Sequence, residues 1–542
     1  MMEEKKKLED PIVQSGEDNF EIEPASTGDG GFEEIVWYRR HDIWAWFGGI
    51  LFILALMGAM MGIGEARGWD AAAGHTHNTS ATSLDRFLPE PYLEEPGVKW
   101  RSGADRTGLW YYWKLDPAKV TAASRAFMWI GYAGHQLSIW FVTYRAQVAK
   151  ASRPFGEKKY TPFMDKYNWA AFGLNAFFHI LHLINTHTTY DATAQDVSIA
   201  SSQGSVIMAL CFVIFLEYSE RGLWLGWPGP NDHDKVAKKI RTAPLEAVRL
   251  MRKYHGYAIS WAAIYTFWYH PMENTIGHAF GFVHTWLLVL QGSLMHTKFH
   301  QNKWWRFILE AWVTIHALLV ALQTGDPNVL NGTLLWPMFL FGFLFTLCFT
   351  WIYIFPFWSK ISGWFRLAPV VLYFAATIGS YSQILDRQGR PFTRLQEIIR
   401  IPGIIYIFFF VIWGFVALFQ LIDKKINGGP TTKAPSAGQQ VGLIFGFLFG
   451  YAVMIGVSIM FHVLDWQTQM FTLMAILVAL FTIGVAATSV CLHRLIPARI
   501  SAKIEDMDVS NQVVLTSIVP KGGQQNNGYD QSTEQIVQTK SV

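Results

Sequence analysis

About twelve apolar stretches, each long enough to cross a lipid bilayer, constrain the fold of this chain more than any other feature. A helix needs about 20 apolar residues to cross the hydrocarbon layer, which is about 30 Å thick. Only 16% of the 542 residues are Asp, Glu, Lys or Arg, against about 25% in an average soluble chain. The sequence therefore predicts an all-α integral membrane protein. The predicted spans are residues 43–64, 122–146, 167–187, 197–218, 253–270, 274–296, 304–323, 332–357, 366–385, 401–422, 441–463 and 468–492.

The positive charges of the loops predict the orientation of these spans. The loops after spans two and four are rich in Lys and Arg, whereas the loops after spans three, five, seven and eleven contain neither. Short cytoplasmic loops collect Lys and Arg, so both the N-terminus and the C-terminus are predicted to be cytoplasmic. Segment 386–400 is an exception, because it carries four arginines on the predicted outer side.

The chain divides into three parts by composition. Residues 1–41 and 501–542 are polar and predict a disordered cytoplasmic N-terminus and a disordered cytoplasmic tail. Residues 42–500 predict the transmembrane bundle, with an outer loop at 65–121. Within it, spans two to seven (about 122–323) are rich in histidine, and spans eight to twelve (about 332–492) are predicted to serve mainly in packing.

Two N-x-S/T motifs, at Asn78 and Asn331, lie in loops predicted to be outside. Such motifs are the acceptors of N-glycosylation, so a glycoprotein with these two sites is expected. The three cysteines are scattered along the apolar stretches, and none has a partner at the C-x-x-C spacing. A disulfide framework and a thiolate metal site are therefore not expected.

Histidines are the most informative polar residues of the predicted spans. Membrane helices rarely keep ionisable residues, and those that they keep mark candidate functional sites. In span three, Asn175, His179 and His182 follow one another at positions i, i+4 and i+7, which places them on one stripe of a helix. This stripe is expected to face the interior of the bundle, either as a hydrogen-bonded polar seam or as a source of ligands.

Spans five, six and seven extend this set of histidines, whereas spans eight, nine and ten contain none. The predicted metal ligands are His179, His182, His270, His278, His284 and His316. A further set is predicted to line a proton pathway or to support the ligands: His135, Asn175, Glu273, Gln291 and Glu310. Arg306 and Glu310 are four residues apart and are expected to neutralise each other.

Three explanations fit the histidines. Neutral imidazole is a common ligand of iron, copper and zinc, and histidine pairs at two depths suit two b-type haems. Chains of His with Asp or Glu also relay protons in pumps and transporters. The third explanation is that His255, His296 and His300, near the predicted cytoplasmic boundary, are only interfacial polar residues; for these three it is the preferred one.

The resulting function hypotheses are a metal- or b-haem-dependent membrane oxidoreductase and, as the alternative, a proton or metal-ion transporter or channel that uses the same histidines. The expected cofactor of the first is b-type haem, iron, copper or zinc. The expected partners are the lipid bilayer and a lipid-soluble or small-molecule substrate, or a transported ion, and the net charge of +3 gives no reason to expect nucleic acid. The plasma membrane and an endomembrane are both open as locations.

Overall fold

The computed structural model describes most of the predicted bundle, and every structural statement below concerns its described part alone. The described residues are 36–66, 121–151, 160–188, 196–197, 199–229, 232, 234–269, 276–324, 336–386, 388–427, 435–463 and 476–496. Residues 1–35 of the predicted N-terminal tail, the predicted C-terminal tail and most of the predicted outer loop lie outside these ranges, and so do Asn78, Asn331, His270 and Glu273. The predictions made for these segments and residues stay predictions. Residues 36–41, predicted to be disordered, are ordered: they include η1 (Trp37–Arg39) and the first residue of α1.

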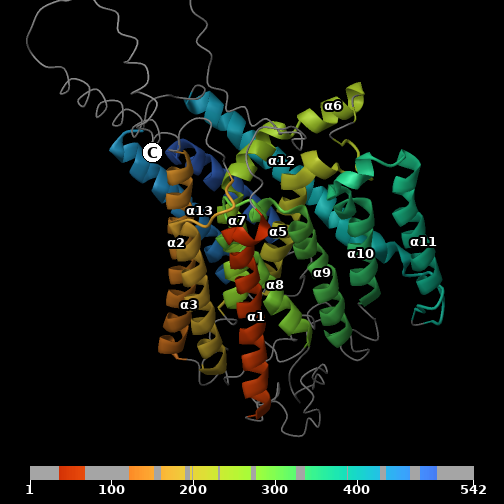
Figure 1. Cartoon of the computed structure of the whole chain (residues 1–542), viewed down its shortest axis with the longest axis horizontal. Coiled ribbons are helices and arrows are strands. Elements are labelled where there is room, and N and C mark those ends of the chain that lie inside the picture. The colour runs from red at the N-terminus through yellow and green to blue at the C-terminus, as the bar shows by residue number, and fades with distance from the viewer. Residues whose placement is uncertain are drawn as a thin grey trace, which may run out of the picture.

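Helices make up the fold, and no strand occurs in the described ranges (Figure 1). Each of the twelve predicted spans overlaps a helix of the described chain. The helices are α1 (His41–Ala66), α2 (Ala122–Ala151), α3 (Lys166–Thr188), α5 (Ile199–Arg221), α6 (Lys235–Thr242), α7 (Leu245–Tyr269), α8 (Ile276–Ser293), α9 (Lys303–Thr324), α10 (Trp336–Phe349), α11 (Ala368–Tyr381), α12 (Arg400–Asn427), α13 (Ala437–Val463) and Ile476–Ile496. Short 3-10 helices lie between them, including η4 (Phe299–Gln301) and η8 (Leu395–Ile399).

Six helical segments of the described chain are long and apolar enough to cross a membrane. They are His41–Ala59, Lys303–Leu322, Trp336–Ile354, Leu395–Ile426, Ala437–Met460 and Ile476–Ile496. The prediction of a helical membrane protein is therefore supported, whereas the number of twelve spans and the cytoplasmic placement of the termini stay predictions. Several of the other predicted spans carry more polar residues, which helices in the interior of a bundle can keep.

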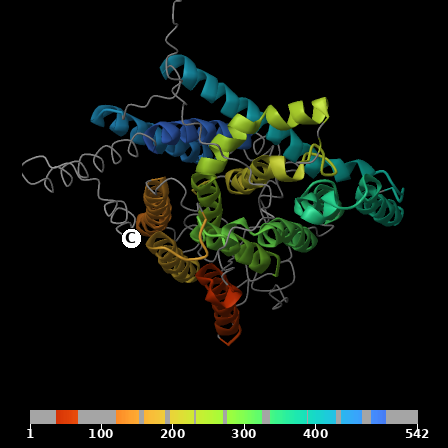
Figure 2. The same cartoon turned by 45° about the horizontal axis from the view of Figure 1, so that its top comes forward.

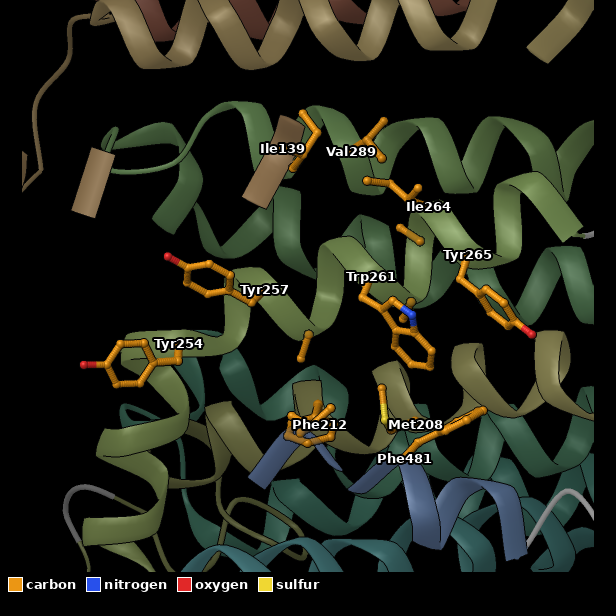
Figure 3. Close-up of a cluster of buried hydrophobic side chains, with 14 of the residues drawn as sticks. Ile139, Met208, Phe212, Tyr254, Tyr257, Trp261, Ile264, Tyr265, Val289 and Phe481 are labelled. Carbon is orange, nitrogen blue, oxygen red and sulfur yellow. The ribbon is translucent and has the colours of Figure 1, made fainter. Parts of the chain in front are cut away.

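Helix α7 forms the centre of the bundle. It contacts α2, α5, α8 and α12, and every side chain from Trp261 to Tyr269 is buried. A helix that is buried on all sides carries apolar residues all round, as this segment does. Figure 3 shows Trp261 beside Met208 of α5, and the ring of Trp261 also lies 4.9 Å from that of Phe481. Figure 2 shows α1 at the edge of the bundle, away from α12 and α13.

Seven helix ends meet at one end of the bundle, here called the inner end. Asp42, at the start of α1, is fully buried; its carboxylate accepts hydrogen bonds from the backbone N–H of Phe299 (2.8 Å) and from Arg40 (2.7 Å). Asn168, at the start of α3, donates to the carbonyl oxygen of Ser293 at the end of α8 (2.8 Å). The ends of α2 and α5 and the starts of α7 and α9 join the same region through the contacts described below. The loop charges predict that the inner end is cytoplasmic.

Segment 386–400 carries four arginines and breaks the charge pattern of the loops. Two of these arginines form ion pairs with nearby acids. Arg390 lies 2.8 Å from Asp386, and Arg394 lies 2.9 Å from Glu397. The Arg394–Glu397 pair is mostly shielded from solvent, since the two side chains are 11% and 8% exposed. Neighbouring acids therefore neutralise two of the four arginines. A count of Lys and Arg alone leaves these acids out.

Candidate functional site

The polar stripe of α3 faces the interior of the bundle. Asn175, His179 and His182 are 7%, 2% and 0% exposed. Their neighbours come from α2 and α8, which pack against α3, and from α7, whose Phe267 ring contacts both histidines. Their burial agrees with the expected inward orientation. Whether they form a hydrogen-bonded polar seam or a ligand site depends on the partners of each side chain.

His135 of α2 belongs to a hydrogen-bonded chain across four helices. Trp268 Nε1 of α7, which can only donate, points at His135 Nδ1 at 3.1 Å. His135 Nε2 therefore carries the proton and donates to Asn175 Oδ1 at 2.8 Å. The Asn175 amide nitrogen donates in turn to Ser293 Oγ at 2.9 Å. Both ring nitrogens of His135 are in use, so this imidazole has a structural role in the conformation described.

His179 and His182 lie among aromatic rings. The His179 ring stacks on Trp286 of α8, with centroids 4.1 Å apart and an interplanar angle of 13°. Its Nε2 atom is buried and makes no hydrogen bond within the described part of the chain. The His182 ring lies 4.1 Å from Phe267 and 4.9 Å from Trp268. The stacked indole covers one face of His179, so a flat cofactor does not fit beside it without moving Trp286.

His284 lies on the other side of α8. Its Nε2 donates to the carbonyl oxygen of Leu309 in α9 at 2.8 Å, and His316 of α9 packs against Gly281, one turn earlier on α8. Positions 284 and 286 point in nearly opposite directions on a helix, so α8 separates His284 and His316 from His179 and His182. His278 lies in α8, but its side chain is outside the described set, as is all of His270.

The four described ligands of the predicted metal site thus form two groups. Among the described residues no group of three or more His, Cys, Asp or Glu side chains could hold a metal ion. The arrangement of these four histidines on two faces of α8 gives no sign of a single pocket among the described residues, and the predicted metal site stays a prediction. The spacing of Asn175, His179 and His182 correctly predicts that they share one face of α3. It does not predict which face of α8 packs against them, and this packing places His284 on the other side of α8.

Gly281 is required for the position of His316, which gives a testable prediction. A Cβ atom at Gly281 would lie 2.9 Å from both ring nitrogens of His316. Gly281→Ala is expected to displace that ring and to lower stability by about 1–3 kcal/mol, the usual effect of overpacking. The matched control is Gly173→Ala in α3, where a Cβ meets nothing within 4 Å. Thermal unfolding of both variants in detergent measures the difference, and equal midpoints would contradict the prediction.

A different histidine pair lies at the inner end, where the sequence predicted only interfacial residues. The rings of His255 in α7 and His300 in η4 have centroids 6.0 Å apart. His255 Nδ1 donates to the carbonyl oxygen of Arg252 at 2.7 Å, and His300 Nδ1 donates to that of Gln291 at 2.8 Å. A carbonyl oxygen can only accept, so Nδ1 carries the proton in both rings and each neutral imidazole keeps a lone pair on Nε2.

The side chain of Gln291 fixes the segment that carries His300. Its amide nitrogen donates to the His300 carbonyl oxygen at 2.9 Å, and its amide oxygen accepts from Trp305 Nε1 at 2.8 Å. Gln291 was predicted to support ligands, and it supports His300 rather than the outer group. The turn before η4 is also held from the other side, because Lys298 N donates to the carbonyl oxygen of Thr161 at 2.9 Å.

Basic side chains surround the two inner imidazoles. Lys150, at the end of α2, lies 3.0 Å from His296 Nδ1 and 4.1 Å from the centre of the Tyr160 ring. Lys150 and Arg306 both act electrostatically on His255 and His300. Burial, the neighbouring His255 and these cations lower the pKa of His300 to about 3. The imidazole of His300 is therefore neutral at physiological pH.

An ion-pair network joins α5, α7 and α9 beside this pair. Arg221 lies 2.6 Å from Glu310 and 3.5 Å from Glu217. Arg306 lies 2.8 Å from Glu217 and 3.1 Å from Glu220, and Arg252 lies 3.6 Å from Glu220. The predicted pairing of Arg306 with Glu310 is wrong, because each residue has its close ion pair with α5 instead. A neighbouring helix can offer a shorter ion pair than one turn of the same helix, and the sequence does not reveal that neighbour.

Comparison of the chain with protein-family models, with curated proteins and with solved structures finds no match.

Proposed function

We propose that this helical membrane protein is an oxidoreductase or electron-transfer protein that binds a b-type haem through His255 and His300. The observation that carries the proposal is the pair of imidazoles with centroids 6.0 Å apart, each held at Nδ1 by a backbone carbonyl. Histidines that bind metals commonly donate their second ring nitrogen to such an acceptor, which fixes the tautomer and the ring orientation.

The separation of the rings suits one metal between them. His255 and His300 are the two residues that would hold the metal, since their ring centroids are 6.0 Å apart. The neutral state of His300, whose pKa is lowered to about 3, leaves its Nε2 lone pair available for a metal. Both properties would be required of a histidine that binds haem iron.

The number of ligands and the local charge favour haem over a bare ion. Two histidines leave a bare ion short of ligands, whereas a porphyrin supplies four further nitrogens. Haem also carries two propionates, which pair well with guanidinium and ammonium groups. Lys150, Arg252 and Arg306 are the candidates for this role in the described chain, because all three act electrostatically on His255. Bound haem would supply one-electron chemistry whose potential depends on these ligands and charges.

His284 and His316 are the candidate ligands of a second centre. His284 is also held by a backbone carbonyl, that of Leu309, and His316 lies beside it across α8 and α9. Along α8, His284 and Gln291 are seven residues apart, or about 10 Å at 1.5 Å per residue. Gln291 in turn holds His300, so the two histidine pairs are connected by a short stretch of one helix.

Absorption spectroscopy of the purified full-length protein tests the proposal. A Soret band, haem extractable into pyridine and iron in proportion to protein are the expected results. Cells must be supplied with a haem precursor during expression, so that cofactor limitation does not produce the apo protein. Colourless, iron-free protein that gains no Soret band when titrated with haemin would overturn the proposal.

Ion transport is the second candidate, and the ion-pair network favours it. Arg221 and Glu310 are 1% and 5% exposed, and Glu310 lies in the predicted span 304–323. Buried ionisable residues of this kind also mark ion pathways. Proteoliposomes distinguish the two candidates. A pH-dependent ion flux that is lost in Glu310→Gln, in protein without haem, would identify transport as the function.

A further inference from the structure

The connection between α5 and α7 forms a platform at the inner end, separate from the histidine pairs. It consists of the loop Gly222–Gly229 and helix α6. The Arg241 side chain of α6 donates to the carbonyl oxygen of Gly229 at 2.9 Å, and Tyr218 of α5 donates to the carbonyl oxygen of Ile240. Leu225 N donates to the carbonyl oxygen of Phe349 in α10 at 2.8 Å. Hydrogen bonds therefore attach both the loop and helix α6 to the bundle.

Helix α6 directs its lysines away from these contacts. Lys235, Lys238 and Lys239 are exposed and follow one another at positions i, i+3 and i+4, which places them on one face. The opposite face carries the buried Ala237 and the tethered Arg241. Figure 1 shows α6 at the top of the bundle, projecting beyond the ends of its neighbours.

Exposed apolar side chains accompany the lysines. Trp224 and Trp227 of the loop are 42% and 38% exposed, and Val236 of α6 is 61% exposed. Two acids nearby are already engaged: Asp232 accepts from Gly229 N at 2.6 Å, and Asp234 caps α6 by accepting from Ala237 N at 2.8 Å. Lysines beside tryptophans suit the boundary of an anionic leaflet, where the ring enters the headgroup layer and the ammonium group meets phosphate or carboxylate.

We infer that this platform, formed by Trp224, Trp227 and the lysines of α6, binds the anionic headgroups of the membrane leaflet at the inner end. Charge complementarity identifies the occupant, since the three lysines and Arg241 outnumber the two neighbouring acids, Asp232 and Asp234. The tethers of α6 keep the three charges in a fixed arrangement, so binding does not require the platform to fold. The inference does not depend on the proposed haem, because it rests on the charges and the exposure of the platform alone.

Titration of the purified full-length protein in detergent with fluorescent phosphatidylserine and phosphatidylcholine tests this inference. Wild type is expected to prefer phosphatidylserine. Neutralising a lysine near an anionic surface lowers affinity about fivefold, so the triple variant Lys235→Gln/Lys238→Gln/Lys239→Gln should lose about 100-fold. The triple Lys→Arg variant keeps the charges and should retain the wild-type affinity. High salt should weaken binding of the wild type and leave the Gln variant unchanged.

The matched control is Lys424→Gln/Lys425→Gln, which removes two exposed lysines at the end of α12. It should bind phosphatidylserine as the wild type does. Unchanged affinity in the triple Gln variant would overturn the inference, as would equal losses in the control. Inorganic phosphate provides a further arm: if it competes with phosphatidylserine at equal concentration, the platform takes free phosphate and the assignment to lipid is wrong. Failure of every lipid to bind, together with capture of an acidic protein, would also exclude the leaflet.

Discussion

Replacing Arg221 with alanine is expected to lower the free energy of unfolding by about 3–5 kcal/mol. Arg221 is 1% exposed and lies between Glu310 at 2.6 Å and Glu217 at 3.5 Å. Its removal leaves two buried carboxylates without their shared cation, and a buried charge without a partner is far more costly than the pair. Arg306 also pairs with Glu217, so Glu310 is the carboxylate that loses most.

Thermal unfolding in detergent, followed by tryptophan fluorescence, measures this effect. Arg221→Met/Glu310→Met removes the close pair and fills the space with apolar atoms, so it should be more stable than Arg221→Ala. Arg390→Ala is the surface control, because Arg390 is 66% exposed in its pair with Asp386 and exposed pairs contribute about 0–1 kcal/mol. The prediction fails if Arg221→Ala and Arg390→Ala unfold at the same temperature.

Replacing His300 with alanine is expected to abolish the Soret band of the purified protein. The variant removes one of the two imidazoles that the proposed haem requires, and it leaves the carbonyl oxygen of Gln291 without the Nδ1–H of the ring. His255→Ala should have the same effect, because the two rings are equivalent in this geometry. His41→Ala is the control, since His41 is an exposed histidine at the same end of the bundle.

Chemical rescue separates ligation from a loss of folding. Free imidazole can enter the space left in His300→Ala, so it should restore a Soret band when added together with haemin. A variant that unfolds is not rescued in this way, and its elution profile in size exclusion will differ from that of the wild type. Full haem content in both His255→Ala and His300→Ala would mean that these rings hold no haem.

The sequence predicts the positions of the helices well, because one physical quantity governs them. An apolar stretch of about 20 residues identifies a span, and each predicted range overlaps a helix of the described chain. Helix α3 was also correctly oriented, since i, i+4 and i+7 spacing places Asn175, His179 and His182 on one face. The apolar length of each stretch and the rotation of one helix about its axis are properties of local sequence.

The candidate site was harder to predict, because its partners are backbone atoms and neighbouring helices. The feature that singles out His255 and His300 is the hydrogen bond from each Nδ1 to a backbone carbonyl oxygen, that of Arg252 or Gln291. Every residue has a carbonyl oxygen, so the sequence cannot show which one a histidine will contact. The sequence places His255, His296 and His300 near one boundary of the bundle, but it does not show that His296 lies beside Lys150 whereas His255 and His300 lie beside each other. Arg306 and Glu310 show the same limit, since their partners on α5 are far away in the sequence.

The hydrogen bonds that connect Trp268, His135, Asn175 and Ser293 bear on whether protons can leak across the membrane. A proton can hop along hydrogen bonds only if each group can give up one proton and accept another. The indole nitrogen of Trp268 has no lone pair to receive a proton, so it cannot pass one on to His135. Protons therefore cannot pass through Trp268 into this series of hydrogen bonds. A helix stripe rich in imidazole and amide groups can thus lie inside a membrane without letting protons leak across it.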